Sequence, residues 1–548
     1  MPENFNELLK QDFSDLEAAV DSWRKLAKAL EEAQARHRHK VTGPLHASNW
    51  HGTDASYAFL QMEANETQLG TAQSDVTSIA TVLATVHTKM REAQEDLRRC
   101  VRTAELDGYA VDDHGNVTDR STSCPTGNAD TEAQEEHQLR IAKLEGYQND
   151  IQYCLDAAGT ASWEGMQLLQ QIDAFNLDKD YGASKAEEGA RKAAEFAHLD
   201  EDAIPSKKDP KENAKWWSGL SEQERQEYLD AYPEKIGWLD GIPSTDRDEA
   251  NRKVVDLQLA EYEMKKQNGE LGIRDQRQYE GLQKLKDSLG KSDGSNDENK
   301  RLYVLGIDTK ARDGRAVVSQ GNPDTARNVA VQVPGTDNDL TNVDDQIDRV
   351  DRLQQAAQDK GGGESTAVVS WLGYDAPEVD GSMATTGRAD AAAGDLRSFT
   401  HGLRESHTGE RAHMTVLGHS YGSTVVGDAA AHSNGIDADD VVVVGSPGMT
   451  VDHAKDLQMD PNHVWAGWAP DDIVSTVASN KTLGENPAEQ DFGGKIFNVD
   501  TEGHGGYWDK GSESLANQGR IIAGMPPRPG EYRVPPQYNP PGESGPKW

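Results

Sequence analysis

The chain has 548 residues, more than one hydrophobic core supports, so two or three domains are expected. Its formal net charge of −38 disfavours nucleic acid and anionic membrane surfaces as partners. No apolar run reaches the roughly 20 residues of a membrane-spanning helix, and residues 1–6 lack the basic and apolar regions of an ordinary signal peptide. We therefore expect a globular protein that is cytoplasmic or exported without a cleavable signal peptide.

Two long helices are predicted in the first part of the chain. Apolar residues in 5–40 and again in 53–104 recur at alternating spacings of four and three, which favours two helices packed against each other. Trp50-His51-Gly52 lies in the turn between them. Over about 5–105 this arrangement resembles the WXG100 family, small helical hairpins associated with type VII secretion. The resemblance implies a WXG100-like partner or a homodimer through these helices, and a type VII-like route if the protein is exported.

Residues 108–118 have two interpretations. Tyr109 and Asp113 fit the export signal Y-x-x-x-D/E of that family, but the Asp-His-Gly-Asn sequence at 113–116 favours a β-hairpin, which is the interpretation we prefer. A third helical stretch is predicted over 131–180, and Trp163-Glu164-Gly165 within it is interpreted as core packing.

The cysteines indicate no disulfide framework. Cys100, Cys124 and Cys154 fit no zinc-site spacing and are interpreted as free thiols, although a bridge from Cys100 to Cys154 or Cys124 stays open for an exported protein.

Four segments follow from these patterns. We predict an α-helical bundle over 1–200, a charged helical connecting region over 201–300, an α/β domain over 301–524 and a proline-rich tail over 525–548. The connecting region is expected to pack on the α/β domain, and its role as a lid stays open.

From residue 301 onward, strand and helix patterns alternate. Continuous apolar runs with helical crossovers predict a mainly parallel eight-stranded sheet with helices on both faces, the plan of an α/β-hydrolase fold. The predicted strands are 302–307, 315–319, 328–333, 366–371, 414–417, 441–444, 464–468 and 495–499, and the predicted helices are 341–359, 385–405, 422–432 and 512–523.

The sequence Gly418-His419-Ser420-Tyr421-Gly422 matches G-x-S-x-G between a predicted strand and a predicted helix. In this context the motif is typical of a nucleophile elbow, a tight turn with serine at its apex. A serine hydroxyl needs a base to remove its proton and an acid to orient that base. In this fold the three groups follow in the order serine, acid, histidine.

His504 is the one histidine beyond the eighth predicted strand, so it is the predicted base. Asp471 and Asp472 follow the seventh strand, and spacing alone does not choose between them. The predicted oxyanion donors are the backbone N–H groups of Tyr421 and of Thr336, with Gly335 as the alternative to Thr336. Neither a metal nor an organic cofactor is predicted.

Several stretches in order resemble the actinobacterial α/β-hydrolase family DUF1023 over about 210–524. They include Trp238-Leu-Asp-Gly-Ile-Pro243, Val333-Pro-Gly-Thr336, the elbow, Ala469-Pro-Asp-Asp-Ile-Val474, and His504 followed by Tyr507. The family pattern Ala-Pro-Gly-Asp-Pro-Val aligns its acid with Asp472, while Asp471 and Ile473 depart from it. The resemblance implies a serine hydrolase with Ser420, Asp472 and His504 as its triad.

Two functions are expected from these features. The first is hydrolysis of a small-molecule or lipid ester. Aromatic residues near the strand ends have two interpretations: they bind an apolar acyl group of the substrate, or they are ordinary core residues. These aromatic residues are Trp371, Tyr374, Tyr421 and Tyr507. The alternative is a type VII secretion-related effector or partner-binding protein in which the helical hairpin carries the main role.

Overall fold

The computed structural model describes residues 5–46, 48, 50–121, 131–175, 183–205, 209–295, 297–474 and 482–533. Cys124 and the last part of the proline-rich tail, 534–548, lie outside these ranges. The chain forms two compact units: the first comprises 1–35, 65–203 and 226–231, and the second comprises 36–64, 204–225 and 232–548. The domain boundaries near residues 200 and 300 stay a prediction.

The second unit is built on an eight-stranded sheet with the order β10-β9-β8-β7-β5-β6-β4-β3. Strands β5 to β10 run parallel, and β4 pairs antiparallel with both β6 and β3. This confirms the predicted fold. The strands are β3 (Leu302–Asp308), β4 (Arg315–Gln320), β5 (Asn328–Val333), β6 (Thr366–Leu372), β7 (His413–His419), β8 (Asp440–Val444), β9 (Val464–Gly467) and β10 (Lys495–Ile496).

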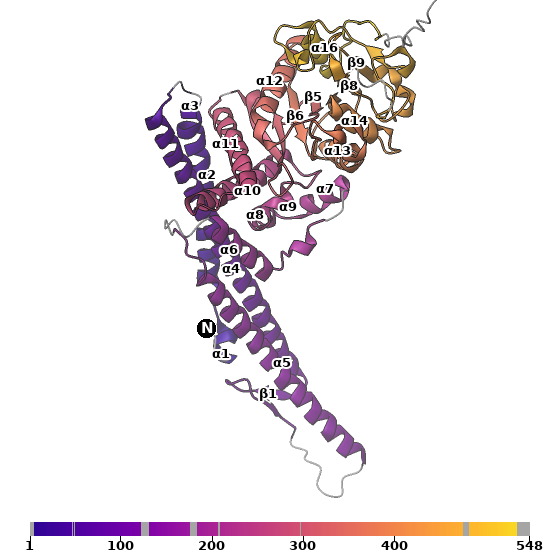
Figure 1. Ribbon diagram of the computed structural model, residues 1–548. Coiled ribbons are helices and arrows are strands. Elements are labelled where there is room, and N and C mark those ends of the chain that lie inside the picture. The colour runs from indigo at the N-terminus through magenta and orange to yellow at the C-terminus, as the bar shows by residue number, and fades with distance from the viewer. Residues whose placement is uncertain are drawn as a thin grey trace, which may run out of the picture. The chain divides into compact units, whose positions relative to one another are not determined.

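Helices cover both faces of the sheet (Figure 1). The near-continuous apolar strands require this, because each strand presents buried side chains to both sides. Helices α13 (Gly387–Ser406) and α14 (Tyr421–Ala431) share one core with the sheet, and α12 (Val343–Lys360) and α16 (Glu513–Ile522) share another with its opposite face.

Residues 204–300 are helical and pack partly on the sheet. Leu282 and Val254, from two of these helices, share a core with Val304 of β3 and Val318 of β4. The helices are α7 (Pro210–Gly219), α8 (Glu222–Ala231), α9 (Pro233–Ile236), α10 (Ser244–Gln267) and α11 (Ile273–Asp293).

The first part of the chain is helical, with one difference from the prediction. The segment 5–40 is not one helix, because the chain breaks at 11–13, where the Asp12 carboxylate accepts a hydrogen bond of 3.0 Å from the Ser14 amide. The helices are α1 (Phe5–Lys10), α2 (Ser14–His37), a π-helix (Arg38–Thr42), α3 (Gly43–His46), α4 (Thr53–Leu106), α5 (Thr131–Leu169) and α6 (Ala183–Phe196).

The β-hairpin predicted after α4 is present. Strands β1 (Tyr109–Val111) and β2 (Val117–Asp119) pair antiparallel. The Asp112 carboxylate accepts hydrogen bonds from the His114 and Asn116 amides and so holds the turn. Tyr109 is buried, and its hydroxyl donates to the Arg140 carbonyl oxygen.

Cys100 and Cys154 are free thiols in the described part of the chain. Burial, followed by the charges of Asp150 and Cys154, raises the pKa of Cys100 to about 11, and burial also raises the pKa of Cys154. Neither thiol is therefore activated as a nucleophile at neutral pH.

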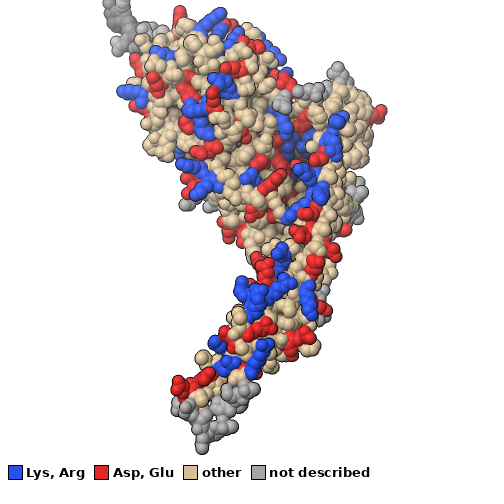
Figure 2. Space-filling model, turned by 180° about the vertical axis from the view of Figure 1, so that it is seen from behind, with Lys and Arg blue, Asp and Glu red and all other residues tan. Residues whose placement is uncertain are grey.

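The surface in Figure 2 mixes basic and acidic side chains along the whole visible face, so this face carries no broad basic surface of the kind that binds nucleic acid. Among the described residues, no helix is both long enough and apolar enough to cross a membrane.

Candidate active site

Ser420 lies at the turn between β7 and α14 in a strained backbone conformation. Its φ of 52° and ψ of −130° fall in a region that residues with a side chain rarely adopt. The turn is closely packed, because a Cβ atom at Gly422 would lie 2.2 Å from the Val333 carbonyl oxygen. The Ser420 amide donates to the Val444 carbonyl oxygen at 3.1 Å, which ties the turn to β8.

His504 and Asp472 form a hydrogen-bonded pair. Nδ1 of His504 lies 2.9 Å from Oδ1 and 3.0 Å from Oδ2 of Asp472, whose side chain is fully buried. Asp471 is exposed and instead accepts a hydrogen bond of 2.8 Å from the Gly503 amide. Of the two adjacent carboxylates, the structure therefore brings only Asp472 to the histidine.

Tyr507 also contacts this carboxylate. Its hydroxyl donates to Oδ2 of Asp472 at 2.6 Å and accepts from the Ala469 amide at 3.2 Å. Burial raises the pKa of Asp472, but hydrogen bonds from His504 and Tyr507 and the nearby His504 charge outweigh it, so the net shift is downward. Asp472 is thus held as a carboxylate that accepts hydrogen bonds.

His419, immediately before the serine, joins the elbow to the His504 loop. Its Nε2 lies 3.0 Å from the His504 carbonyl oxygen, and the two ring centroids are 4.7 Å apart. Burial, then the charges of His504 and Arg349, lower the pKa of His419 to about 3. A neutral imidazole can donate from Nε2 to that carbonyl, which positions the loop beside the turn that carries Ser420.

The two predicted oxyanion donors lie on adjoining backbone segments. A Cβ atom at Gly335 would lie 2.7 Å from Cβ of Ser420 and 2.9 Å from the Tyr421 nitrogen, so the loop after β5 runs directly against the elbow. Within the described part of the chain, neither the Thr336 nor the Tyr421 amide donates a hydrogen bond. Both N–H groups are therefore available to an oxyanion, and Gly335 remains the alternative to Thr336.

The aromatic residues near the strand ends belong mainly to the framework. The Tyr421 hydroxyl donates to the Thr385 carbonyl oxygen at 2.6 Å, and the Tyr374 hydroxyl donates to the Pro334 carbonyl oxygen at 2.7 Å. Trp371 stacks on Tyr374 with centroids 6.1 Å apart. All are buried, which favours the interpretation as core residues over that of an acyl-binding surface.

Sequence reasoning missed the roles of Tyr507 and His419. Tyr507 was grouped with the aromatic residues, and His419 was an unspecified position of the elbow motif. The spacing of Tyr507, three residues after His504, could have suggested that it turns back toward the acid, but only the loop conformation shows the contact.

Together these groups can supply a nucleophile, a proton acceptor oriented by a buried carboxylate, and amide donors for a developing negative charge. That combination, on a mainly parallel sheet with the serine at a strand-to-helix turn, defines the class of α/β hydrolases.

Comparisons with known proteins agree with this class. The α/β-hydrolase family matches residues 309–482. An uncharacterized protein of Mycobacterium tuberculosis is 30% identical over 364 residues, which cover 57% of this chain and 55% of that protein. An uncharacterized protein of Mycobacterium bovis is 30% identical over 216 residues, which cover 38% of this chain and 79% of that protein. No solved structure matches the chain.

The chain belongs to the α/β-hydrolase family. It spans about half the length of the first of these mycobacterial relatives.

Proposed function

We propose that the protein is a serine hydrolase that cleaves a carboxylic ester through an acyl-enzyme intermediate. The observation that carries the proposal is the hydrogen-bonded pair of His504 and Asp472, whose loop contacts His419, the residue immediately before the strained Ser420. The family supports hydrolase chemistry, and the resemblance of 210–524 to DUF1023 supports a serine nucleophile.

In this mechanism, Oγ of Ser420 attacks the ester carbonyl carbon while its proton passes to Nε2 of His504. Asp472 stabilises the resulting imidazolium and keeps Nδ1 protonated. The amides of Tyr421 and Thr336 hold the oxyanion. When the C–O bond to the alcohol breaks, the alcohol takes the proton from His504. Water then attacks the acyl-serine by the same steps and releases the acid.

A fluorophosphonate probe tests the nucleophile, because it labels only activated serines. We expect labelling of the native chain and none of Ser420→Ala or His504→Ala, while Ser433→Ala, at an exposed serine, labels normally. A series of p-nitrophenyl esters would then grade acyl-chain length. An unlabelled but folded native chain, or labelling that persists in Ser420→Ala, contradicts the proposal.

A second candidate, binding of a protein partner through the helical region, is favoured by one observation. Trp163 was expected in the core, but 56% of it is exposed, and on the same helix, α5, Tyr153 is 74% and Leu139 61% exposed. Aromatic residues such as Trp and Tyr are enriched in protein interfaces. We propose a homodimer or a WXG100-like partner as the occupant, in keeping with a type VII-related role.

Light scattering of the full chain distinguishes these cases. A concentration-dependent dimer that Tyr153→Glu and Trp163→Glu abolish supports the homodimer, whereas Glu164→Gln, beside Trp163, serves as the control. A strict monomer excludes the homodimer and leaves a WXG100-like protein as the partner to test by titration.

A further inference from the structure

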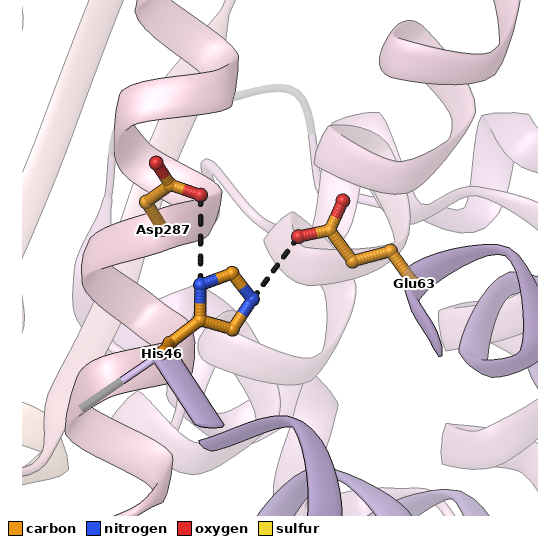
Figure 3. A group of neighbouring side chains, drawn as sticks. All are labelled: His46, Glu63 and Asp287. Atoms are coloured by element: carbon orange, nitrogen blue, oxygen red, sulfur yellow. Dashed lines mark ion pairs between the residues drawn. The ribbon is translucent and has the colours of Figure 1, made fainter. Parts of the chain in front are cut away.

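A histidine and two carboxylates from three separate helices meet in the second unit, and none of them belongs to the predicted active site. His46 ends α3, Glu63 lies on α4 and Asp287 lies on α11 (Figure 3). Nε2 of His46 lies 3.2 Å from Oε1 of Glu63, and Nδ1 lies 3.8 Å from Oδ1 of Asp287. One ligand atom from each residue can be chosen so that all three lie within 4.8 Å of one another.

The surrounding packing fixes the histidine. Only 6% of its side chain is exposed, and its ring stacks on Phe59 with centroids 4.7 Å apart. Gly290 leaves room for the ring, because a Cβ atom there would lie 3.0 Å from Cδ2 of His46. Close approach of the backbones at Gly43 and Gly294 brings α3 against the end of α11. The imidazole is therefore preorganised, and a ligand site needs only the carboxylates to adjust.

The donor set suits a divalent transition metal. Imidazole nitrogen and carboxylate oxygen are both ligands that Zn²⁺ binds in proteins, with bonds of about 2.0–2.2 Å. Two ligands of a tetrahedral ion are then about 3.3 Å apart, close to the 3.2 Å between Nε2 of His46 and Glu63. Asp287 has to move to complete the set, and its side chain is 57% exposed and so has space to rotate.

The charges point the same way. The cluster places two carboxylates, those of Glu63 and Asp287, around one imidazole ring, and their negative charges repel each other. A bound divalent cation neutralises both carboxylates.

We propose that His46, Glu63 and Asp287 bind Zn²⁺, with water completing the coordination. The bound ion would cross-link the end of α3 and the first turns of α4 to α11 and so stabilise their packing. This site is independent of the proposed hydrolase function. The sequence contains no short motif that predicts this metal site, because its three ligands come from distant parts of the sequence.

The test uses the full chain, stripped with EDTA and titrated with Zn²⁺ by calorimetry in excess Mg²⁺, which occupies weak acidic sites. We expect about one ion per chain, and binding weakened roughly tenfold or more in His46→Gln and in Asp287→Asn. The controls are Glu280→Gln on the same helix and His453→Gln, whose imidazole contacts a backbone carbonyl, and both bind as the native chain does. Zn²⁺ also raises the Tm of the native chain, and Asp287→Asn removes this shift.

Two results overturn the proposal. One is a calorimetric titration in which Zn²⁺ does not bind stoichiometrically, or in which Zn²⁺ binds the native chain and Asp287→Asn equally well. The other is a Tm that ignores Zn²⁺ but falls with rising pH only when His46 is present, which identifies the cluster as an imidazolium held between two carboxylates. Asp287 lies at the surface, so its variant is expected to fold even if His46→Gln does not.

Discussion

Asp472 accepts hydrogen bonds from His504, Tyr507 and the Val474 amide. The bond to Nδ1 fixes the tautomer in which Nε2 can accept the serine proton. Asp472→Asn turns an acceptor into a donor on one side and favours the wrong tautomer. We expect kcat to fall by about 10⁴-fold, as such changes do in serine proteases, while Asp471→Asn changes it only slightly. Steady-state kinetics on a p-nitrophenyl ester measure both, and a larger loss in Asp471→Asn than in Asp472→Asn would favour Asp471 as the acid.

Tyr507→Phe removes one donor to the same carboxylate and leaves the ring packing intact. A hydrogen bond to a charged group contributes about 1.5–3 kcal/mol, so we expect roughly a tenfold to hundredfold lower kcat with little change in KM. Tyr147→Phe, whose hydroxyl donates to the Asp107 carboxylate in the first unit, is the control. An unchanged kcat in Tyr507→Phe would show that the tyrosine does not position Asp472.

The lowered pKa of Asp472 also links stability to pH. Because this pKa is lower in the folded chain than the usual value of 3.8, the carboxylate stabilises the fold fully above that value. Its contribution is lost as the pH falls through the folded value. We expect Asp472→Asn to flatten the fall in the free energy of unfolding as the pH decreases below the usual value of 3.8. Denaturant titrations over this range measure it, and parallel curves for the two proteins contradict the shift.

Individual site residues could be predicted best where they belong to a motif of adjacent residues. The elbow follows from five adjacent residues, and His504 follows from the order of strands. Asp471 and Asp472 could not be separated from sequence alone, because the choice depends on which carboxylate the loop turns inward. The cluster of His46, Glu63 and Asp287 could not be predicted, because no single helix contains more than one of these residues.

Helix α10 is joined to β3 by buried polar side chains. Arg247 donates to the carbonyl oxygens of Leu305 and Gly237, and it pairs with Asp240 at 3.0 Å. Asn251 donates to the carbonyl oxygens of Val304 and Gly237. These bonds attach the connecting region to the antiparallel edge of the sheet.

Arg247→Leu leaves the Asp240 carboxylate buried without its cation. We expect the free energy of unfolding to fall by about 3–5 kcal/mol. Combining it with Asp240→Leu should restore part of this loss, since the unpaired charge is then removed as well. Denaturant unfolding of both variants checks this, and a double variant no more stable than the single one would show that the bonds to β3 matter more than the pair.

The ends of helices and strands could be predicted where an apolar run gives way to polar or turn-forming residues. The valine-rich strands and their crossovers follow from continuous apolar runs. The break between α1 and α2 was missed because the apolar seam of Leu9, Phe13 and Leu16 continues across it. The Asp12 side chain interrupts the backbone there without disturbing that spacing.

The two compact units have separate cores, so each should unfold with its own transition. Leu97 is fully buried in the core of the first unit, and Val416 is fully buried in the second. We expect calorimetry to resolve two transitions, with Leu97→Ala lowering one and Val416→Ala lowering the other. A Leu→Ala change of this kind costs about 2–5 kcal/mol. One shared transition that both variants lower equally would show a single cooperative fold and contradict the proposed domain division.

The path of the chain between these units has a practical consequence. Residues 36–64 belong to the hydrolase-bearing unit, yet 65–203 of the other unit come between them and the strands. The helical part is therefore interposed in the hydrolase-bearing part rather than appended to its end. A recombinant fragment that starts near residue 200 discards part of the unit it is meant to isolate. A fragment that replaces 65–203 with a short flexible linker keeps every segment of that unit, but it also retains 1–35 and 226–231 of the other unit without the rest of their core.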